Sequence, residues 1–247
     1  MKVRIEKEPI RALIITGNSA RHNYFLKILA ANFVIVGLIC DPKKNYYEDT
    51  IEKSDLVRRH FVSLKQYELA CFNSHNANLN FSNNVLESNE INSTFVQEWS
   101  SKLQFDVILV FGSGILGDHW ISNYPEQIIN LHLGLSPRYR GSATLFWPFA
   151  NDELEFLGTT IHILTKGIDS GPILKSVKPK ELKHLNYYEI TNNLIRDSID
   201  IFPNVVRDYL LGKIEPSPQD PREQKYYYRK SDFNEQILSE VLAKYAK

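Results

Sequence analysis

Short apolar runs alternate with amphipathic segments along the first half of the chain. Residues 11–16 and 33–40 are rich in branched apolar side chains, and each run stops at a turn residue, which is typical of buried parallel strands. Residues 20–31 between them place apolar side chains at helical spacing. A strand, a helix and a strand in this order predict a parallel sheet with a right-handed crossover.

Further apolar runs extend this predicted sheet. They cover residues 105–111, 127–133, 158–164 and 172–177. The run at 158–164 alternates polar and apolar positions with period two, as a half-buried strand does. The run at 172–177 is expected to be its partner.

The intervening segments predict helices over residues 51–70, 89–103 and 186–212. Pro203 must kink or divide the last of these. A terminal helix is expected to begin near Ser231, a good N-cap residue. Polar or proline-rich stretches are expected to form loops or extended chain at 41–50, 73–84 and 215–225.

Together these elements predict an α/β fold with a mostly parallel sheet flanked by helices. The length of 247 residues suits one large domain with a small appendage. We expect the main domain to cover residues 1–180. Residues 181–247 are expected to form a small helical C-terminal extension packed on it.

Charge and cysteine content narrow the class of protein. Lys and Arg number 29, as do Asp and Glu, so the net charge of zero gives no overall attraction to nucleic acid or anionic membranes. Cys40 and Cys71 form no C-x-x-C pair, which indicates a reduced, intracellular protein rather than a zinc site. No stretch approaches the roughly 20 apolar residues of a membrane span, and the N-terminus lacks a signal-peptide pattern. We expect a soluble, cytoplasmic protein.

Candidate chemistry concentrates in residues 128–173. A predicted strand presents Asn130 and His132 on the same face of the sheet, because side chains alternate with period two. The strand then breaks into a Gly- and Pro-containing loop, and functional groups often lie at such carboxyl ends. Asp169 follows in the turn Gly-Ile-Asp-Ser-Gly. Taken alone, Asn-x-His is more often structural, and Asp169 could be an Asx-turn residue.

The combined pattern resembles the formyltransferase family that uses 10-formyltetrahydrofolate, which includes glycinamide ribonucleotide, methionyl-tRNA and sugar-nucleotide N-formyltransferases. The family pattern is Asn-x-His-x-Ser-Leu-Leu-Pro with a Tyr-Arg-Gly-like continuation, then Gly-x-Thr-x-His and Asp-x-Gly. The matching residues are Asn130, His132, Pro137, Tyr139, Arg140, Gly141, Gly158, Thr160, His162, Asp169, Gly171 and Ile173. Gly134 stands where the family often has serine, and Ser136 is displaced by two positions, so no role is carried over for that hydroxyl.

The resemblance implies a Rossmann-like formyltransferase fold and gives the three central residues separate roles. The Asn130 amide and protonated His132 would donate hydrogen bonds to the tetrahedral oxyanion that forms when an amine attacks the formyl carbon. His132 could also move the proton from the amine to the leaving folate nitrogen. Asp169 would orient His132, and no metal or covalent enzyme intermediate is required. His162 could take part or be a satisfied core histidine.

By resemblance, 10-formyltetrahydrofolate would bind between the loop after the 105–111 strand and the loop before Asp169. Backbone groups would read its pterin ring. The first loop lacks G-x-G-x-x-G and a Walker lysine, so we reject nucleotide binding there. The implied cofactor contacts are Phe111, Gly112, Ser113, Gly114, Ile115, Leu116, Thr165, Lys166, Gly167 and Ile168.

The acceptor is expected near the end of the first strand, where a helix N-terminus offers an anion site. An alternative is that this segment is a plain capping turn with a solvated arginine, and that Arg140 is a structural salt-bridge partner. The candidate acceptor contacts are Asn18, Arg21, His22, Arg138, Tyr139 and Arg140.

We expect the acceptor to be a nucleotide-linked amino sugar. Methionyl-tRNA enzymes usually add a C-terminal domain and a basic surface, and the opening segment does not match the phosphate loop of glycinamide ribonucleotide enzymes. The aromatic and basic tail at 226–233 resembles those of sugar enzymes. We expect no nucleic-acid or membrane partner, and the C-terminal helices could supply a homodimer surface. Alternatives are the other two acceptors, a formyltetrahydrofolate hydrolase, and a non-catalytic folate-binding homologue.

Overall fold

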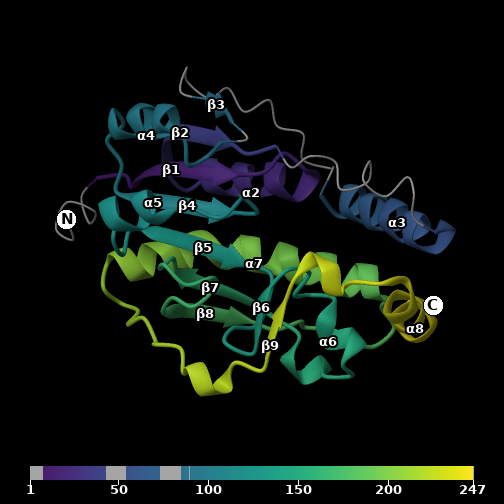
Figure 1. The fold of residues 1–247 in the computed structure, drawn as a ribbon. Coiled ribbons are helices and arrows are strands. Elements are labelled where there is room, and N and C mark those ends of the chain that lie inside the picture. The colour runs from purple at the N-terminus through teal and green to yellow at the C-terminus, as the bar shows by residue number, and fades with distance from the viewer. Residues whose placement is uncertain (1–7, 43–53, 73–84, 89, 247) are drawn as a thin grey trace.

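The computed structural model describes residues 8–42, 54–72, 85–88 and 90–246. Within these residues, seven strands form one sheet in the order β3-β2-β1-β4-β5-β7-β8 (Figure 1). Neighbouring strands from β3 to β5 are parallel, whereas β7 is antiparallel to both β5 and β8. The predicted mostly parallel sheet is confirmed. The strands are β1 Arg11–Thr16, β2 Val34–Cys40, β3 Val85–Glu87, β4 Val107–Phe111, β5 Ile128–His132, β7 Thr159–Ile163 and β8 Ile173–Val177.

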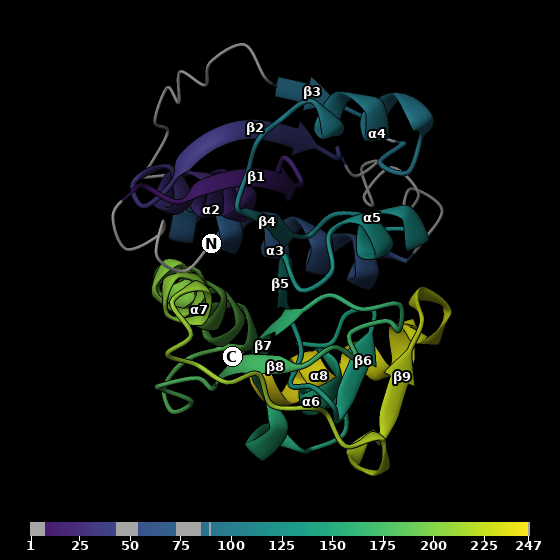
Figure 2. The ribbon, with the colours of Figure 1, turned by 90° about the vertical axis from the view of Figure 1, so that its left-hand side faces the viewer.

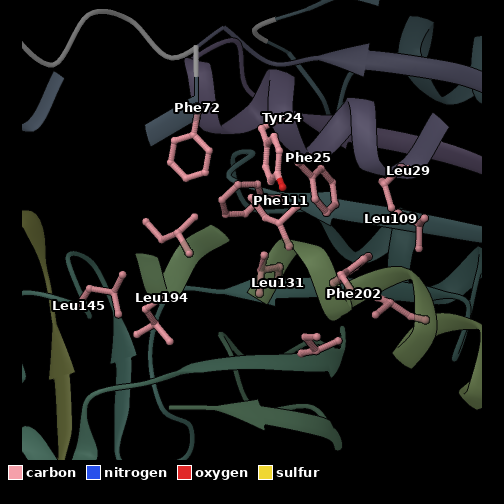
Figure 3. Packing of buried hydrophobic residues seen from close by; sticks show 14 of the residues in the cluster. Tyr24, Phe25, Leu29, Phe72, Leu109, Phe111, Leu131, Leu145, Leu194 and Phe202 are labelled. Atoms are coloured by element: carbon pink, nitrogen blue, oxygen red, sulfur yellow. The ribbon is translucent and has the colours of Figure 1, made fainter. Parts of the chain in front are cut away.

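Helices cover both faces of the sheet, as Figure 2 shows. Alternate residues of the central strands enter different cores: Ile14 packs with α2 and α7, whereas Leu13 and Ile15 pack with α4 and α5. Burial on both faces explains why β1 and β4 are continuous apolar runs. Figure 3 shows the first of these cores. The helices are α2 Ala20–Ala30, α3 Asp55–Phe72, α4 Thr94–Ser101, α5 Asp118–Asn123, α6 Trp147–Ala150, α7 Tyr187–Leu210 and α8 Glu235–Tyr245.

The long helix α7 is not divided at Pro203, contrary to one of the two outcomes that the sequence predicts. Asn186 caps its first turn through the amides of Tyr188 and Glu189. Pro203 is buried inside the helix, next to Phe202 in the main core. The buried helix face formed by Phe202, Pro203, Val205 and Val206 offsets the hydrogen bond that the proline cannot donate. The division of the chain after residue 180 stays a prediction, although α7 contributes directly to the core under β5 and β7.

The C-terminal region differs from the prediction in two ways. The last helix begins at Glu235 and is capped by Asn234, because residues 230–232 around Ser231 form a 3₁₀ turn. In addition, β9 (Tyr226–Tyr228) pairs in parallel with β6 (Tyr139–Gly141) as a second, two-stranded sheet. This pairing fixes the tail beside the residues that follow β5. The expected loops at 43–50 and 73–84 lie outside the described residues. Among the described helices, none is both long and apolar enough to cross a membrane.

Candidate active site

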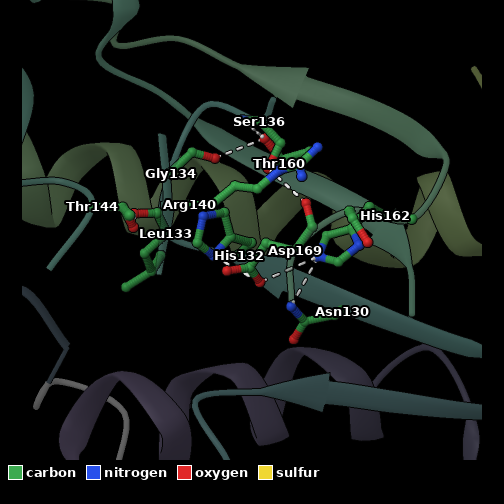
Figure 4. A network of polar contacts seen from close by, with 12 residues as sticks. Asn130, His132, Leu133, Gly134, Ser136, Arg140, Thr144, Thr160, His162 and Asp169 are labelled. Atoms are coloured by element: carbon green, nitrogen blue, oxygen red, sulfur yellow. Dashed lines mark hydrogen bonds and ion pairs between the residues drawn. The ribbon is translucent and has the colours of Figure 1, made fainter. Parts of the chain in front are cut away.

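The three residues singled out from the sequence lie together at the end of β5. Asn130 and His132 come from the strand, and Asp169 reaches them from the turn before β8 (Figure 4). His132 Nδ1 is 3.3 Å from Asp169 Oδ1, and His132 Nε2 is 3.3 Å from the carbonyl oxygen of Tyr139. Both ring nitrogens face acceptors, which a protonated imidazole satisfies with two N–H donors.

Asn130 is oriented by a buried histidine on the neighbouring strand. Asn130 and His162 are directly opposed in the β5–β7 register, and Asn130 Nδ2 donates to His162 Nε2 over 3.1 Å. His162 Nδ1 lies 3.0 Å from the carbonyl oxygen of Ile163, which requires the ring proton on Nδ1. Burial, and then the neighbouring His132, lower the pKa of His162 and favour this neutral ring. The Asn130 amide has a second N–H, which can serve a ligand.

Thr160 holds the loop that follows His132. Its hydroxyl donates to the carbonyl oxygen of Gly134 over 2.7 Å and accepts from the amide of Ser136 over 2.9 Å. A Cβ at Gly134 would lie 2.5 Å from His132 Nε2 and 2.6 Å from Thr144 Cβ, so a side chain there would displace the ring. Glycine at this position therefore suits the site. Ser136 is buried behind the loop, where its hydroxyl lies 3.4 Å from the carbonyl oxygen of Asp169.

Asp169 is both a turn residue and a partner of His132. Its φ of +50° lies in the left-handed region, which Asp and Asn adopt more readily than most residues. Its Oδ2 accepts from the backbone N–H of Gly141 over 3.2 Å, while Oδ1 faces His132. Gly171, at the end of the same turn, lies so close to the carbonyl oxygen of Ile163 that any Cβ would collide with it. Asp169 therefore lies in a turn, but its carboxylate faces Gly141 and His132 and not the backbone of its own turn.

A cavity of about 760 Å³ opens over these residues. Asn130, His132 and Asp169 line it, as do both loops that the family resemblance assigns to the cofactor. Ile115 and Ile168 are exposed by 71% and 39% and offer apolar surface. The structure thus brings together every predicted cofactor contact, namely Phe111, Gly112, Ser113, Gly114, Ile115, Leu116, Thr165, Lys166, Gly167 and Ile168.

A second cavity of about 410 Å³ adjoins the first and shares Arg21, His22, Leu133, Ser142, Thr144, Arg229 and Lys230 with it. Of the predicted acceptor contacts, Asn18, Arg21 and His22 line this second cavity. His22 also caps its own helix, because its Nδ1 accepts from the amide of Ser19 over 3.1 Å. The Arg21 guanidinium lies 3.7 Å from Glu68, so it is a paired rather than a solvated arginine.

The other three predicted acceptor contacts do not line either cavity. Tyr139 is fully buried, and its hydroxyl donates to Glu153 over 2.8 Å. Arg138 makes two bonds to the same carboxylate, over 2.8 and 3.0 Å, and these bonds lower the pKa of Glu153 to about 2. Arg140 is also buried and donates to Gln219 and Gln224. These contacts hold residues 219–226 in place, and the acceptor role of the three residues stays a prediction that neither cavity supports.

Sequence reasoning missed the side chains that later segments bring to the cavities. Tyr227, Tyr228, Arg229 and Lys230 line the larger one, and Arg229, Lys230 and Phe233 line the smaller one. From the sequence, the segment YYYRK was interpreted only as part of an aromatic and basic tail. Its three consecutive tyrosines were a usable strand signal, because aromatic residues favour strands. In the structure, Tyr226 stacks on Tyr139 and Tyr228 stacks on Trp147.

A family model described as formyl transferase matches residues 12–206. Because this match covers most of the chain, the protein belongs to the formyl transferase family. Among curated relatives, the methionyl-tRNA formyltransferase of Synechocystis sp. is 34% identical over 144 residues, which cover 56% of this chain and 43% of that protein. The methionyl-tRNA formyltransferase of Clostridium tetani is 30% identical over 130 residues, which cover 52% of this chain and 42% of that protein. The matched regions thus span less than half the length of these relatives.

Solved structures of the same fold include several N-formyltransferases. A sugar N-formyltransferase from Shewanella sp. aligns with a TM-score of 0.61 at 15% identity, covering 94% of this chain and 86% of that one. An N-formyltransferase from Helicobacter canadensis, in complex with folinic acid and dTDP-3-aminofucose, aligns with a TM-score of 0.59 at 16% identity, covering 90% and 72%. Phosphoribosylglycinamide formyltransferase from Anaplasma phagocytophilum aligns with a TM-score of 0.57 at 15% identity, covering 90% of this chain and 99% of that one. At these identities, the likeness establishes the α/β fold.

Proposed function

We propose that this chain transfers a formyl group from 10-formyltetrahydrofolate to a primary amine. The observation that carries the proposal is the convergence of Asn130, His132 and Asp169 in the cavity lined by both predicted cofactor loops. Membership of the formyl transferase family supports the same reaction.

The larger cavity fits the donor in size and in chemistry. Its volume of about 760 Å³ lies within the range of small-molecule sites. Its loops offer backbone groups to a pterin edge, and Ile115 and Ile168 offer apolar surface to an aromatic ring. The Helicobacter neighbour was solved with folinic acid, a formylated folate, which supports this choice of donor.

The reaction forms a bond from the amine nitrogen to the formyl carbon and breaks the bond from that carbon to the folate nitrogen. The second N–H of Asn130 donates to the oxygen on which negative charge develops. Protonated His132 donates there too, with the Nε2–H that otherwise faces the Tyr139 carbonyl, while Nδ1–H stays on Asp169. Removing one preorganised donor of this kind costs roughly 3–4 kcal/mol. As the bond from the carbon to the folate nitrogen breaks, His132 gives its proton to that nitrogen and then takes up the proton that the amine loses. Asp169 keeps the His132 ring in place.

We propose a nucleotide-linked amino sugar as the acceptor, bound in the second cavity. Arg21, Arg229 and Lys230 line this cavity and supply cationic groups for phosphate, while Phe61 and Phe233 supply apolar walls. The Helicobacter neighbour, solved with dTDP-3-aminofucose, supports this assignment.

The curated relatives favour a second candidate acceptor, methionyl-tRNA, because the matches at 30–34% identity are to methionyl-tRNA formyltransferases. An RNA acceptor would bind with a steep dependence on salt concentration, because phosphate contacts release counterions. A compact sugar nucleotide would show a weaker dependence.

The test is a mass-spectrometric screen of the full chain with 10-formyltetrahydrofolate and one acceptor at a time. The acceptors are a panel of amino-sugar nucleotides, glycinamide ribonucleotide, methionyl-tRNA and buffer alone. We expect an N-formylated sugar nucleotide. If formylated methionyl-tRNA is the sole product, the acceptor is tRNA and not a sugar nucleotide. Formate release in buffer alone would indicate a hydrolase. Folate binding without any product would indicate a non-catalytic homologue.

A further inference from the structure

The turn that holds Asp169 is bridged by a side chain from the C-terminal tail, which we define as residues 215–233. Gln219 Nε2 donates to the carbonyl oxygen of Asp169 over 2.9 Å and to that of Gly171 over 2.6 Å. One amide group thus ties the residue with φ of +50° to the glycine two positions later. These bonds act on the backbone of the turn, whereas the Asp169 carboxylate is turned toward His132.

Arg140 determines which end of the Gln219 amide faces the turn. Arg140 Nη2 donates to Gln219 Oε1 over 2.7 Å. A guanidinium only donates hydrogen bonds, so the oxygen of the amide must face Arg140 and its nitrogen must face the two carbonyls. Because Arg140 is 8% exposed and follows Tyr139 in β6, it is a fixed support for this orientation.

The tail is anchored on both sides of Gln219. Two residues before it, Ser217 exchanges two backbone hydrogen bonds of 2.8 Å with Ile173 at the start of β8. Further along, Tyr226 donates to the carbonyl oxygen of Arg138 over 2.9 Å and begins the β6–β9 pairing. The amide is therefore held against the Asp169 turn from two directions.

We propose that Gln219 is a positioning residue, which holds the Asp169 turn in the conformation that aims the carboxylate at His132. This inference rests on the proposed function for its kinetic effect. Gln219 lies beyond residue 206, where the family match ends, so the tail completes the site from outside the matched region. Without the amide, the left-handed turn loses two of its hydrogen bonds, and Asp169 Oδ1 loses its fixed place 3.3 Å from His132 Nδ1.

Gln219→Ala and Gln219→Glu are the test variants. Gln219→Glu keeps an oxygen for Arg140 and replaces the donor to the turn by a carboxylate oxygen that repels the two carbonyls. It keeps the size of the side chain, so it covers the case in which the alanine variant folds poorly. Gln224→Ala is the matched control, because Gln224 Oε1 accepts from the other Nη of Arg140 over 2.7 Å. No hydrogen bond joins Gln224 to the Asp169 turn in the part of the chain that the structure describes.

We expect both Gln219 variants to lower kcat about tenfold, the cost of roughly one to two net hydrogen bonds. In both Gln219 variants, KM for donor and acceptor should stay within about twofold, because only the orientation of the Asp169 carboxylate is lost. Gln224→Ala should keep the wild-type kcat. In an Asp169→Ala background, Gln219→Ala should cost nothing further, because it acts through Asp169. An equal loss of kcat in Gln224→Ala, or a full additional loss in the Asp169→Ala background, would overturn the proposal.

A histidine-selective ¹⁵N NMR spectrum separates this inference from the proposed function. The Nδ1 resonance of His132, assigned with His132→Gln, should shift in both Gln219 variants and stay in place in Gln224→Ala. An unchanged resonance in both Gln219 variants would refute the positioning role whether or not any acceptor is formylated. Absence of formyl transfer by the wild-type protein, with the resonance shifted, would refute only the proposed function.

Discussion

The two adjoining cavities are built in different ways. The larger one is lined mainly by two continuous loops, 111–116 and 164–169, that follow strands β4 and β7. The smaller one combines the segment 142–146 with separate side chains from α2, α3, α7 and the C-terminal tail. A site made of continuous loops is visible as sequence motifs, whereas a site assembled from separate elements depends on how those elements pack. This difference explains why every residue predicted for the cofactor lines the larger cavity, whereas only three of the six residues predicted for the acceptor line the smaller one.

The largest expected effect comes from the residue that serves any acceptor. His132→Ala should lower kcat on the order of 10³-fold, because it removes both an oxyanion donor and the proton relay. The loss should be equal for every acceptor that the protein uses. Steady-state kinetics check this, with circular dichroism as the control for folding. Near-normal turnover by a folded variant would contradict the mechanism.

Asn130→Ala should lower kcat about 10²-fold and leave KM for both substrates nearly unchanged, because its N–H acts only as charge develops. Initial-rate measurements with each substrate varied in turn provide the check. A change confined to KM would mean that Asn130 binds the ground state instead.

The smaller cavity should make folding sensitive to pH through His60, which lines it from α3. Burial lowers the pKa of His60 to about 4, so the unfolded chain takes up a proton there between about pH 6.5 and 4 while the folded chain does not. The contribution of His60 to the free energy of unfolding is therefore fully present above about pH 6.5. It falls by about 2 kcal/mol when the pH is lowered to 5. Urea unfolding of the wild type and of His60→Gln should show a shallower pH dependence in the variant. Parallel curves would mean that His60 is not the group that titrates.

Ile115→Ser should raise KM for the donor about tenfold, because it removes apolar surface from the larger cavity only. KM for the acceptor should be unaffected. Kinetics with each substrate varied measure both values, and a rise in acceptor KM alone would reverse the assignment of the two cavities.

Asn18→Ala should have the smallest effect, and it should act on the acceptor and not on the donor. Asn18 is exposed and lines only the smaller cavity, so the loss of one hydrogen bond should raise acceptor KM by about threefold to tenfold. The same kinetic series measures it, with Ile115→Ser as the reciprocal control. An increase in donor KM would show that the acceptor does not bind there.

Strands with strong apolar character were placed from the sequence within one or two residues. The strands that were missed, β3, β6 and β9, each have three residues, too few to show periodicity. Pro203 was expected to kink or divide its helix. The helix is not divided, because burial of the surrounding face overrides local propensity. Ser231 was a plausible cap, but it lies in a 3₁₀ turn, and Asn234 caps α8 instead.

The site divides in the same way. Asn130 and His132 share a strand, so their common face followed from period two, and the turn motif located Asp169. The role of His162 toward Asn130 required the antiparallel β5–β7 register, which no local pattern specifies. Arg138 was expected to bind a phosphate of the acceptor, because arginine is a common phosphate ligand. In the structure it pairs with Glu153, which belongs to neither half of the family pattern.

The most direct test of the central claim is the mass of the product formed from 10-formyltetrahydrofolate and an amino-sugar nucleotide, with wild type and His132→Ala compared side by side. The account predicts an N-formylated sugar nucleotide that accumulates with the wild type and is nearly absent with His132→Ala. Equal product with both proteins, or no formylated amine from any acceptor in the panel, would contradict it.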